Sequence, residues 1–355
     1  MILPDGTTMM VDAGDNGPDN PGGDKLSPVP DDTRTPGEWI VRYVSRYLSE
    51  AGLPERLDYM LVTHFDNDHM GTPVASCPRS LSGRYYMTGV SYVGNKLEAG
   101  TLIDRGYPTY DYPFAGVFDK GSKGIMMNNY LQFIADEYSR VESIQAFRPG
   151  ASDQITLLHD AASYPTFSVR NIYGNGLVWT GAGSATKNIV PADASQSLLD
   201  NENQWSCVIH VNYGDFDYHC GGDIQAFGGW RNIESAVSKV IGETDVFLCD
   251  HHGNDDAMSE DIIRAAKPQV FVVPAWGTSH PGSDALTRMK DKSLYAGDRK
   301  IYVAGPVADV SPYDASGHVV VRVYEGGTTF QVFVLDDATE DRDIIARSAV
   351  LDANS

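Results

Sequence analysis

Four side chains that can bind a metal ion lie within six consecutive positions, where His64, Asp66, Asp68 and His69 form the pattern HxDxDH. An apolar run at residues 59–62 precedes them and predicts a short buried strand, so the four residues would lie on the loop leaving its C-terminal end. Sites in α/β sheets usually lie at that end of the strands. The pattern therefore predicts a metal site. The alternative is a solvated acidic turn that carries two histidines by coincidence.

The spacing of these side chains favours two ions rather than one. Alternate residues of an extended loop point the same way. His64 and Asp66 would then face one ion, and Asp68 and His69 a neighbouring one. Gly71 follows where a tight turn is needed.

This loop resembles the HxHxDH loop of the metallo-β-lactamase-fold hydrolases, with Asp66 in place of the second histidine. The resemblance implies an α/β fold, a four-layer αββα sandwich, as a single domain over residues 1–345. It further implies a family-variable insertion at about 72–150 and a tail at 346–355. A carboxylate in place of an imidazole makes that half of the site harder. We therefore expect two divalent metal ions, with Zn²⁺ first and Mn²⁺ as the alternative.

A second group of candidate metal-binding residues follows in the C-terminal half. Residues 203–223 predict a hairpin that turns near Gly214 and ends in Gly221, Gly222 and Asp223. Glycines before Asp223 would let the backbone approach a bound ion closely. In the family the matching aspartate bridges both metals, and the resemblance assigns that role to Asp223.

The buried run at 245–249 leads into a His-His-Gly sequence at residues 251–253. It resembles a branch of the superfamily that includes the hydrolase domain of late-competence DNA-uptake proteins and phosphorylcholine esterases. There the segment supplies a ligand to the second metal. Adjacent residues of an extended segment point apart, so we expect only one of His251 and His252 to bind the metal. His251 is favoured, and both remain candidates.

The resemblance also suggests roles around the ions. Asp12 would support the ligands from behind, although a plain turn aspartate is the alternative. Asp68 would orient the attacking water as well as bind metal, and His280 would contact substrate or protonate a leaving group. Most members carry a further histidine before the bridging aspartate, where this chain has Asn203 and Ser206. We therefore expect two sites of unequal metal affinity. One ion would be held by His64, Asp66 and Asp223. The other would be held by Asp68, His69, Asp223 and either His251 or His252.

Composition limits the classes of function. The chain has 355 residues, 42% of them hydrophobic, and a formal net charge of -21. Such a charge argues against coating extended nucleic acid or a membrane surface. Four cysteines without CxxC spacing are expected to be buried free thiols. With no apolar run long enough to span a membrane and no visible leader, a cytoplasmic location is the default expectation.

The remaining elements follow from local patterns. Residues 36–51 and 128–141 predict amphipathic helices, and residues 1–14 an opening hairpin. Strands are expected at 154–158, 167–173, 177–179 and 270–274, with a closing hairpin at 319–335 and a fraying tail after Asp336.

The function that these residues favour is metal-dependent hydrolysis by a metal-bridged hydroxide. A phosphodiester or related phosphate ester of small size is the first choice. A lactone or β-lactam hydrolase is the alternative, with its apolar pocket supplied by the tyrosine-rich region 72–150. Outside the enzymes, the chain could be a metal-stabilised binding module without catalysis. The oligomeric state is left open.

Overall fold

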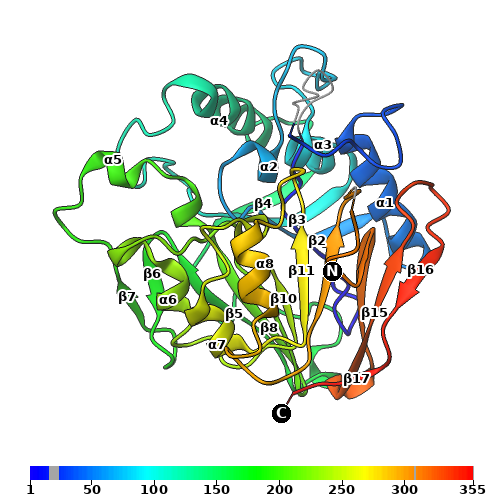
Figure 1. The fold of residues 1–355 in the computed structure, drawn as a ribbon. Coiled ribbons are helices and arrows are strands. Elements are labelled where there is room, and N and C mark those ends of the chain that lie inside the picture. Colours follow the sequence, from blue (N-terminus) through cyan, green and yellow to red (C-terminus); the bar gives the residue numbers. More distant parts are fainter. Residues whose placement is uncertain (16–23, 308, 355) are drawn as a thin grey trace.

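The computed structural model describes residues 1–15, 24–307 and 309–354 (Figure 1). Its first sheet is entirely parallel, in the order β1 (Met9–Val11), β2 (Arg56–Leu61), β3 (Glu98–Asp104) and β4 (Val141–Ala146). Three helices connect these strands: α1 (Pro36–Glu50), α3 (Gly89–Lys96) and α4 (Gly121–Ile134). Parallel strands need such crossover connections.

The second sheet has nine strands in the order β13-β12-β11-β10-β9-β8-β5-β6-β7. Its β9 to β13 side is parallel and its β9 to β7 side antiparallel. The strands are β5 (Phe167–Gly174), β6 (Leu177–Trp179), β7 (Thr186–Asn188), β8 (Val208–Tyr213), β9 (Phe216–Cys220), β10 (Val246–Leu248), β11 (Val270–Pro274), β12 (Lys300–Ala304) and β13 (Ala315–Ser316).

A third sheet is antiparallel and consists of β14 (His318–Val323), β15 (Thr329–Leu335), β16 (Ile344–Arg347) and β17 (Leu351–Asp352). The other α-helices are α2 (Asn67–Met70), α5 (Gln196–Leu199), α6 (Ile233–Val237), α7 (Glu260–Ala266) and α8 (Ser283–Lys290). Short 3₁₀ turns occur at Ala161–Ser163, Asn203–Trp205, Gly229–Arg231, Asp250–Gly253 and Glu325–Gly327.

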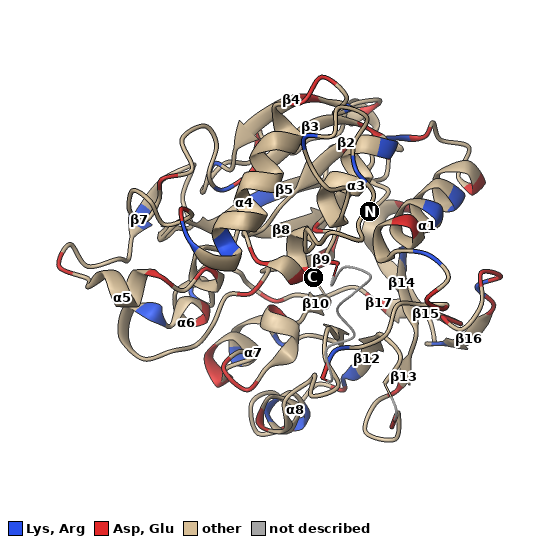
Figure 2. Ribbon diagram, turned by 90° about the horizontal axis from the view of Figure 1, so that it is seen from above, with Lys and Arg blue, Asp and Glu red and all other residues tan. Residues whose placement is uncertain are grey.

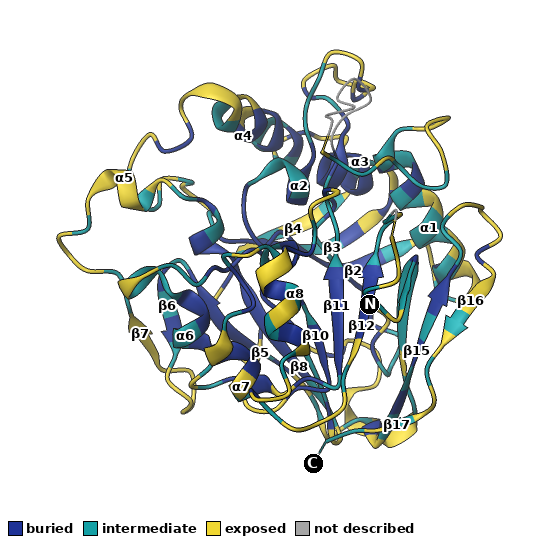
Figure 3. Cartoon of the chain, viewed as in Figure 1, coloured by how far each residue is buried: buried dark blue, intermediate teal, exposed yellow. Residues whose placement is uncertain are grey.

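The apolar core shows how the sheets stack. Strand residues alternate between two faces, so Met60 of β2 packs under α1, α3 and α4 while its neighbours Tyr59 and Leu61 pack against β5, β8 and β9 of the second sheet. The second sheet in turn buries its other face under α6, α7 and α8. One end of the second sheet also packs on β15. In Figure 3 the central strands of the second sheet, such as β11, are buried, whereas α8 exposes one of its faces.

The mixed α/β class is confirmed, whereas the metallo-β-lactamase sandwich stays a prediction. The helix predicted at 36–51 is confirmed as α1. Thr35 caps its N-terminus by accepting from Glu38 N–H while the Glu38 side chain returns to Thr35 N–H. Caps of this kind contribute about 1 kcal/mol.

The strands predicted at 167–173, 177–179, 270–274 and in the closing hairpin are also present. Asn175 and Gly176, both at positive φ, connect β5 to β6 in a two-residue turn that matches the twist of the strands.

The opening hairpin is confirmed in a short form, with an antiparallel bridge between Ile2 and Thr8 and a hydrogen bond from Leu3 N–H to Thr7 O. The chain continues from it into β1, which pairs in parallel with β2.

Three other local predictions are wrong. The second helix is α4, Gly121–Ile134, rather than 128–141, and Val141 begins β4. Residues 154–158 form no strand. The segment after Asp336 does not fray, since β16 and β17 pair with β15.

Lysines and arginines are dispersed among acidic residues along the helices and loops (Figure 2). No helix of the described ranges has both the length and the apolar character needed to cross a membrane. All four cysteines are buried, as expected, and Cys207, Cys220 and Cys249 are free thiols.

Candidate metal centre

The candidate centre lies where parallel strands of the first sheet end together. β1 ends at Val11 beside Leu61 of β2, so Asp12 lies next to the HxDxDH loop, and its N–H donates to Leu61 O at 2.9 Å. Gly14 then passes so close to the loop that a Cβ would lie 1.8 Å from the Asp68 carbonyl oxygen. This contact requires glycine at position 14.

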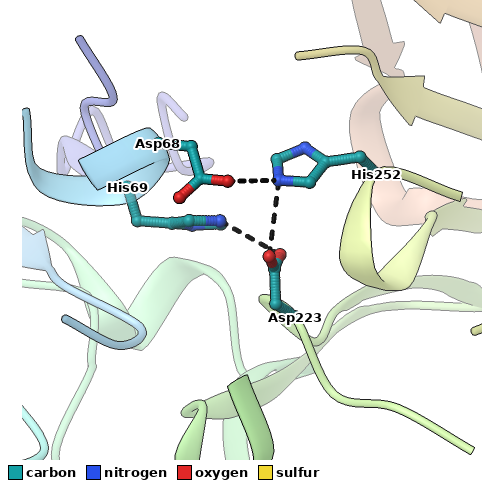
Figure 4. A group of neighbouring side chains, drawn as sticks. All are labelled: Asp68, His69, Asp223 and His252. Atoms are coloured by element: carbon teal, nitrogen blue, oxygen red, sulfur yellow. Dashed lines mark hydrogen bonds and ion pairs between the residues drawn. The ribbon is translucent and has the colours of Figure 1, made fainter. Parts of the chain in front are cut away.

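Four side chains from three segments converge (Figure 4). Asp68 and His69 come from α2, Asp223 follows β9, and His252 follows β10. One ligand atom from each lies within 4.8 Å of the others. His69 Nε2 lies 3.0 Å from Asp223 Oδ1, and His252 Nε2 lies 3.2 Å from Asp68 Oδ2 and 3.4 Å from Asp223 Oδ2. The group can hold a metal ion.

Both histidines of this group are oriented by hydrogen bonds on their other ring nitrogen. His69 Nδ1 lies 2.7 Å from Asp12 Oδ2, and His252 Nδ1 lies 2.8 Å from the Pro274 carbonyl oxygen. Since a carbonyl and a carboxylate only accept, each Nδ1 carries the proton and each Nε2 is directed at the group. Metal-binding histidines in proteins are typically held in this way.

His64 lies beside the group and is completely buried. Its Nδ1 is 3.1 Å from Thr63 Oγ1, which donates to Asp12 Oδ2 at 2.7 Å. His64 Nδ1 therefore donates, and its Nε2 is left as an acceptor. That atom has no hydrogen-bond partner among the described residues, and it lies 3.8 Å from both Asp66 Oδ2 and Asp223 Oδ2.

The adjacent His251 and His252 both face Asp223, with Nε2 atoms 3.9 Å and 3.4 Å from Asp223 Oδ2. Our premise of an extended segment is wrong, because both residues have left-handed backbones, with φ of 45° and 57°. The backbone curves around Asp223, so the two side chains do not point to opposite sides as they would in an extended segment. His251 Nδ1 pairs with Asp256 Oδ1 at 2.6 Å, and its Nε2 lies 3.1 Å from Asn203 Nδ2.

Asp223 is positioned by its own backbone, whose N–H donates to Ser206 Oγ at 3.1 Å. The two preceding glycines allow close packing against side chains. A Cβ on Gly221 would lie 2.0 Å from Asp250 Oδ1, and one on Gly222 would lie 2.8 Å from Thr63 Oγ1. These contacts require glycine at both positions, and the predicted approach of the backbone to an ion stays a prediction.

Burial and neighbouring charges perturb the acids and bases of the centre. Burial, reinforced by Glu202 and Asp68, raises the pKa of Asp66 to about 7. Burial would lower the pKa of His252, but the charge of Asp223 and hydrogen bonds to Asp223 and Asp68 together raise it to about 10. Burial would raise the pKa of Asp223, yet His69 and His252 hold it well below its usual range. Without a cation, the group therefore holds protons between its carboxylates and imidazoles.

His280 stacks on His252, with ring centroids 5.1 Å apart and planes 3° from parallel. Its Nδ1 accepts from the N–H groups of Trp276 and Gly277 at 3.2 and 3.1 Å. The ring proton therefore lies on Nε2, where it can be donated. Burial and the nearby His252 lower the pKa of His280 to about 4, so this donor is neutral at pH 7.

A buried ion pair holds the HxDxDH loop in place. Arg105 and Glu202 are each 1% exposed in their side chains and bond through two nitrogens, at 2.6 and 2.5 Å. Glu202 Oε1 also accepts from Phe65 N–H at 2.9 Å. Sequence reasoning missed Glu202, Thr63 and Asp256. Thr63 alone had a local signal, because it directly precedes His64 at the end of β2.

The residues present fit a divalent cation. Imidazole and carboxylate oxygen donors suit zinc and related first-row metals, and the buried Nε2 of His64 lacks a partner that a cation would supply. The number and identity of the ions do not follow from these contacts.

No protein-family model and no curated protein matches the chain. Among solved structures it matches a crystal structure from Parabacteroides distasonis ATCC 8503 described as a "putative metal-dependent hydrolase". The match covers 73% of this chain and 81% of that chain, at 11% identity and a TM-score of 0.32. A likeness this weak carries no argument about fold or function, which rest on the geometry above.

Proposed function

We propose that the protein is a metal-dependent hydrolase. The observation that carries this proposal is the convergence of Asp68, His69, Asp223 and His252, whose ligand atoms lie within 4.8 Å of one another. Two of the four are imidazoles already oriented by Asp12 and by a backbone carbonyl. A bound divalent ion supplies a Lewis acid and lowers the pKa of a water molecule toward neutrality.

The chain's own groups have the remaining tasks. Asp68 and Asp223 are the carboxylates placed to accept a proton or orient a water beside the ion. His280 offers a neutral Nε2–H at the edge of the group, where it can donate a hydrogen bond to substrate or to a leaving oxygen but, being neutral, does not supply a proton. Asp12 keeps His69 in the tautomer that directs Nε2 inward.

Three further side chains near Asp223 support a second ion. His64 Nε2 and His251 Nε2 both face Asp223 Oδ2, at 3.8 and 3.9 Å, and Asp66 Oδ2 lies 3.8 Å from His64 Nε2. His251 is backed by Asp256, as metal-binding histidines usually are. Its Nε2 is engaged by Asn203, which must move for an ion to bind. We therefore expect the second ion to bind more weakly than the first, with Zn²⁺ preferred and Mn²⁺ as the alternative.

A phosphodiester or related small phosphate ester remains the proposed substrate class, because two ions can stabilise both the attacking and the leaving oxygen. The lactone and β-lactam alternative needed a tyrosine-lined apolar pocket. Tyr85, Tyr92 and Tyr130 are packed in the core, at 1%, 7% and 2% exposure. Tyr86, Tyr110 and Tyr112 are only partly buried, so this alternative stays open with fewer tyrosines to line its pocket.

The first experiment is elemental analysis of the purified chain together with turnover of bis(p-nitrophenyl) phosphate. We expect bound zinc or manganese and turnover in the wild type, and loss of both in Asp223→Ala. Asp217→Ala in the same hairpin is the control, because Asp217 contacts His210 rather than the metal group. Full metal content in Asp223→Ala would overturn the site. Metal binding without turnover of any phosphate ester would overturn the substrate class and favour a binding module.

Metal titration tests the second ion separately. We expect two binding steps in the wild type and one in His251→Ala, with the tight step retained. His159→Ala, which removes an exposed histidine remote from the centre, should leave both steps intact. Loss of the tight step in His251→Ala would contradict this arrangement.

A further inference from the structure

A cavity of about 1080 Å³ lies between α1, the loop at residues 24–35 and the start of β14. Small-molecule sites usually occupy roughly 300–1,000 Å³, so this space can admit an organic ligand. None of the four metal-capable residues lines it. The cavity borders the centre through Gly14 and Trp276, but an inference about its ligand does not use the metal-binding side chains.

Three buried polar atoms in the walls of this cavity lack hydrogen-bond partners. They are Arg342 Nη1, His318 Nε2 and Asp337 Oδ2, from residues that all line the cavity. Buried polar groups are nearly always hydrogen-bonded in proteins, so three such atoms around one space require an explanation.

Arg342 carries most of the argument. It is 8% exposed, and it makes no hydrogen bond or ion pair with any residue in the described ranges. Its guanidinium lies 4.8 Å from the ring centre of Tyr43, and its backbone has a left-handed φ of 62°. A buried charge without a partner is strongly unfavourable, and a strained backbone that holds it in place is a typical feature of ligand sites.

The other deeply buried arginine behaves differently. Arg105 is paired through two nitrogens with Glu202. The fold therefore satisfies a buried guanidinium where no ligand is needed. Near Arg342 the carboxylates of Asp337 and Glu340 interact with the guanidinium through space. Neither forms an ion pair or hydrogen bond with it among the described residues, so a directly paired anion would come from outside the chain.

The groups around Arg342 indicate what that ligand contains. His318 stacks near the same Tyr43 ring, at 4.9 Å between centroids, and burial together with Arg342 lowers its pKa to about 4. A neutral His318 can donate one hydrogen bond from Nε2 without adding charge. Trp39 and Tyr43 of α1 line the cavity with aromatic rings, against which the apolar part of a ligand can pack.

We propose that this cavity binds a small organic anion, whose carboxylate or phosphate group pairs with Arg342 and accepts from His318 Nε2 while its body packs against Tyr43 and Trp39. A guanidinium recognises both kinds of anion through paired N–H groups. The overall charge of -21 would not draw anions from a distance, so recognition depends on these local contacts.

Calorimetric titration of the full chain with benzoate and, separately, with inorganic phosphate tests the proposal. We expect binding of at least one anion to the wild type and at least tenfold weaker binding to Arg342→Met. Arg342→Met removes an unpaired buried charge and should fold, which urea unfolding verifies. Arg264→Met removes an exposed arginine elsewhere and should bind as the wild type does.

His318→Phe provides a second variant, because it keeps a ring beside Tyr43 and removes the Nε2 donor. We expect it to weaken binding of the same anion severalfold. The better of the two anions identifies the ligand class. No binding of either anion to the wild type, or equal affinity in Arg342→Met, would overturn the proposal.

Discussion

Replacing Asp12 by asparagine should weaken metal binding although Asp12 contacts no ion. Its carboxylate accepts three hydrogen bonds of 2.7 Å, from Thr63 N–H, Thr63 Oγ1 and His69 Nδ1. Asparagine tolerates the left-handed backbone at this position, where φ is 55°. Its amide nitrogen, however, donates where Oδ2 accepted. His69 would lose the partner that fixes its tautomer, and Thr63 the partner through which it orients His64.

The expected loss is 10- to 100-fold in metal affinity, roughly 1.4 to 2.7 kcal/mol, as for other groups that orient metal-binding histidines. Competition with a zinc chelator of known affinity measures it. The matched control is Asp58→Asn, because Asp58 accepts from Thr8 N–H and Thr8 Oγ1 on the same sheet, away from the centre. Unchanged affinity in Asp12→Asn, or an equal loss in both variants, would refute the reasoning.

Three further predictions concern the buried scaffold. Glu202→Gln should lower the free energy of unfolding by about 3–5 kcal/mol in urea, because it leaves Arg105 buried without its counter-charge. Burial, reinforced by Asp250, raises the pKa of Glu234 from its ordinary value of 4.5 to about 8. The folded state then holds an extra proton between these values, so stability should fall as pH rises from about 4.5 to about 8. Glu234→Gln should reduce that slope by the share of one group, leaving the part that Asp66 contributes, as urea unfolding at several pH values will show. Finally, a thiol reagent should modify none of the cysteines in the folded chain and all four after denaturation, since all are buried.

Sequence reasoning found most of the centre because the chemistry is concentrated in short segments. His64, Asp66, Asp68 and His69 follow one buried strand, and parallel strands end at the same edge, so their neighbours could be anticipated. The left-handed backbone at His251 and His252 could not be anticipated. A left-handed backbone is uncommon at non-glycine residues, and although histidine adopts it more often than most, two in succession could not be expected from that weak preference.

Elements whose stability comes from tertiary contacts were also missed. β3 contains Glu98, Ala99 and Gly100, which are weak strand formers, yet it lies in the middle of the first sheet. Conversely, residues 154–158 look like a strand but find side-chain partners instead. Thr156 N–H donates to Tyr59 Oη, and Leu158 N–H donates to Thr7 Oγ1.

The loop that carries the candidate ligands is fastened from two sides, by Asp12 at Thr63 and by Glu202 at Phe65. An arriving ion would therefore meet donors already in place, with little conformational entropy left to lose. The rate of metal binding should then be limited by the rate at which each ion loses its hydration shell. Mg²⁺, which dehydrates reluctantly, should enter this centre slowly even where its oxygen ligands are adequate.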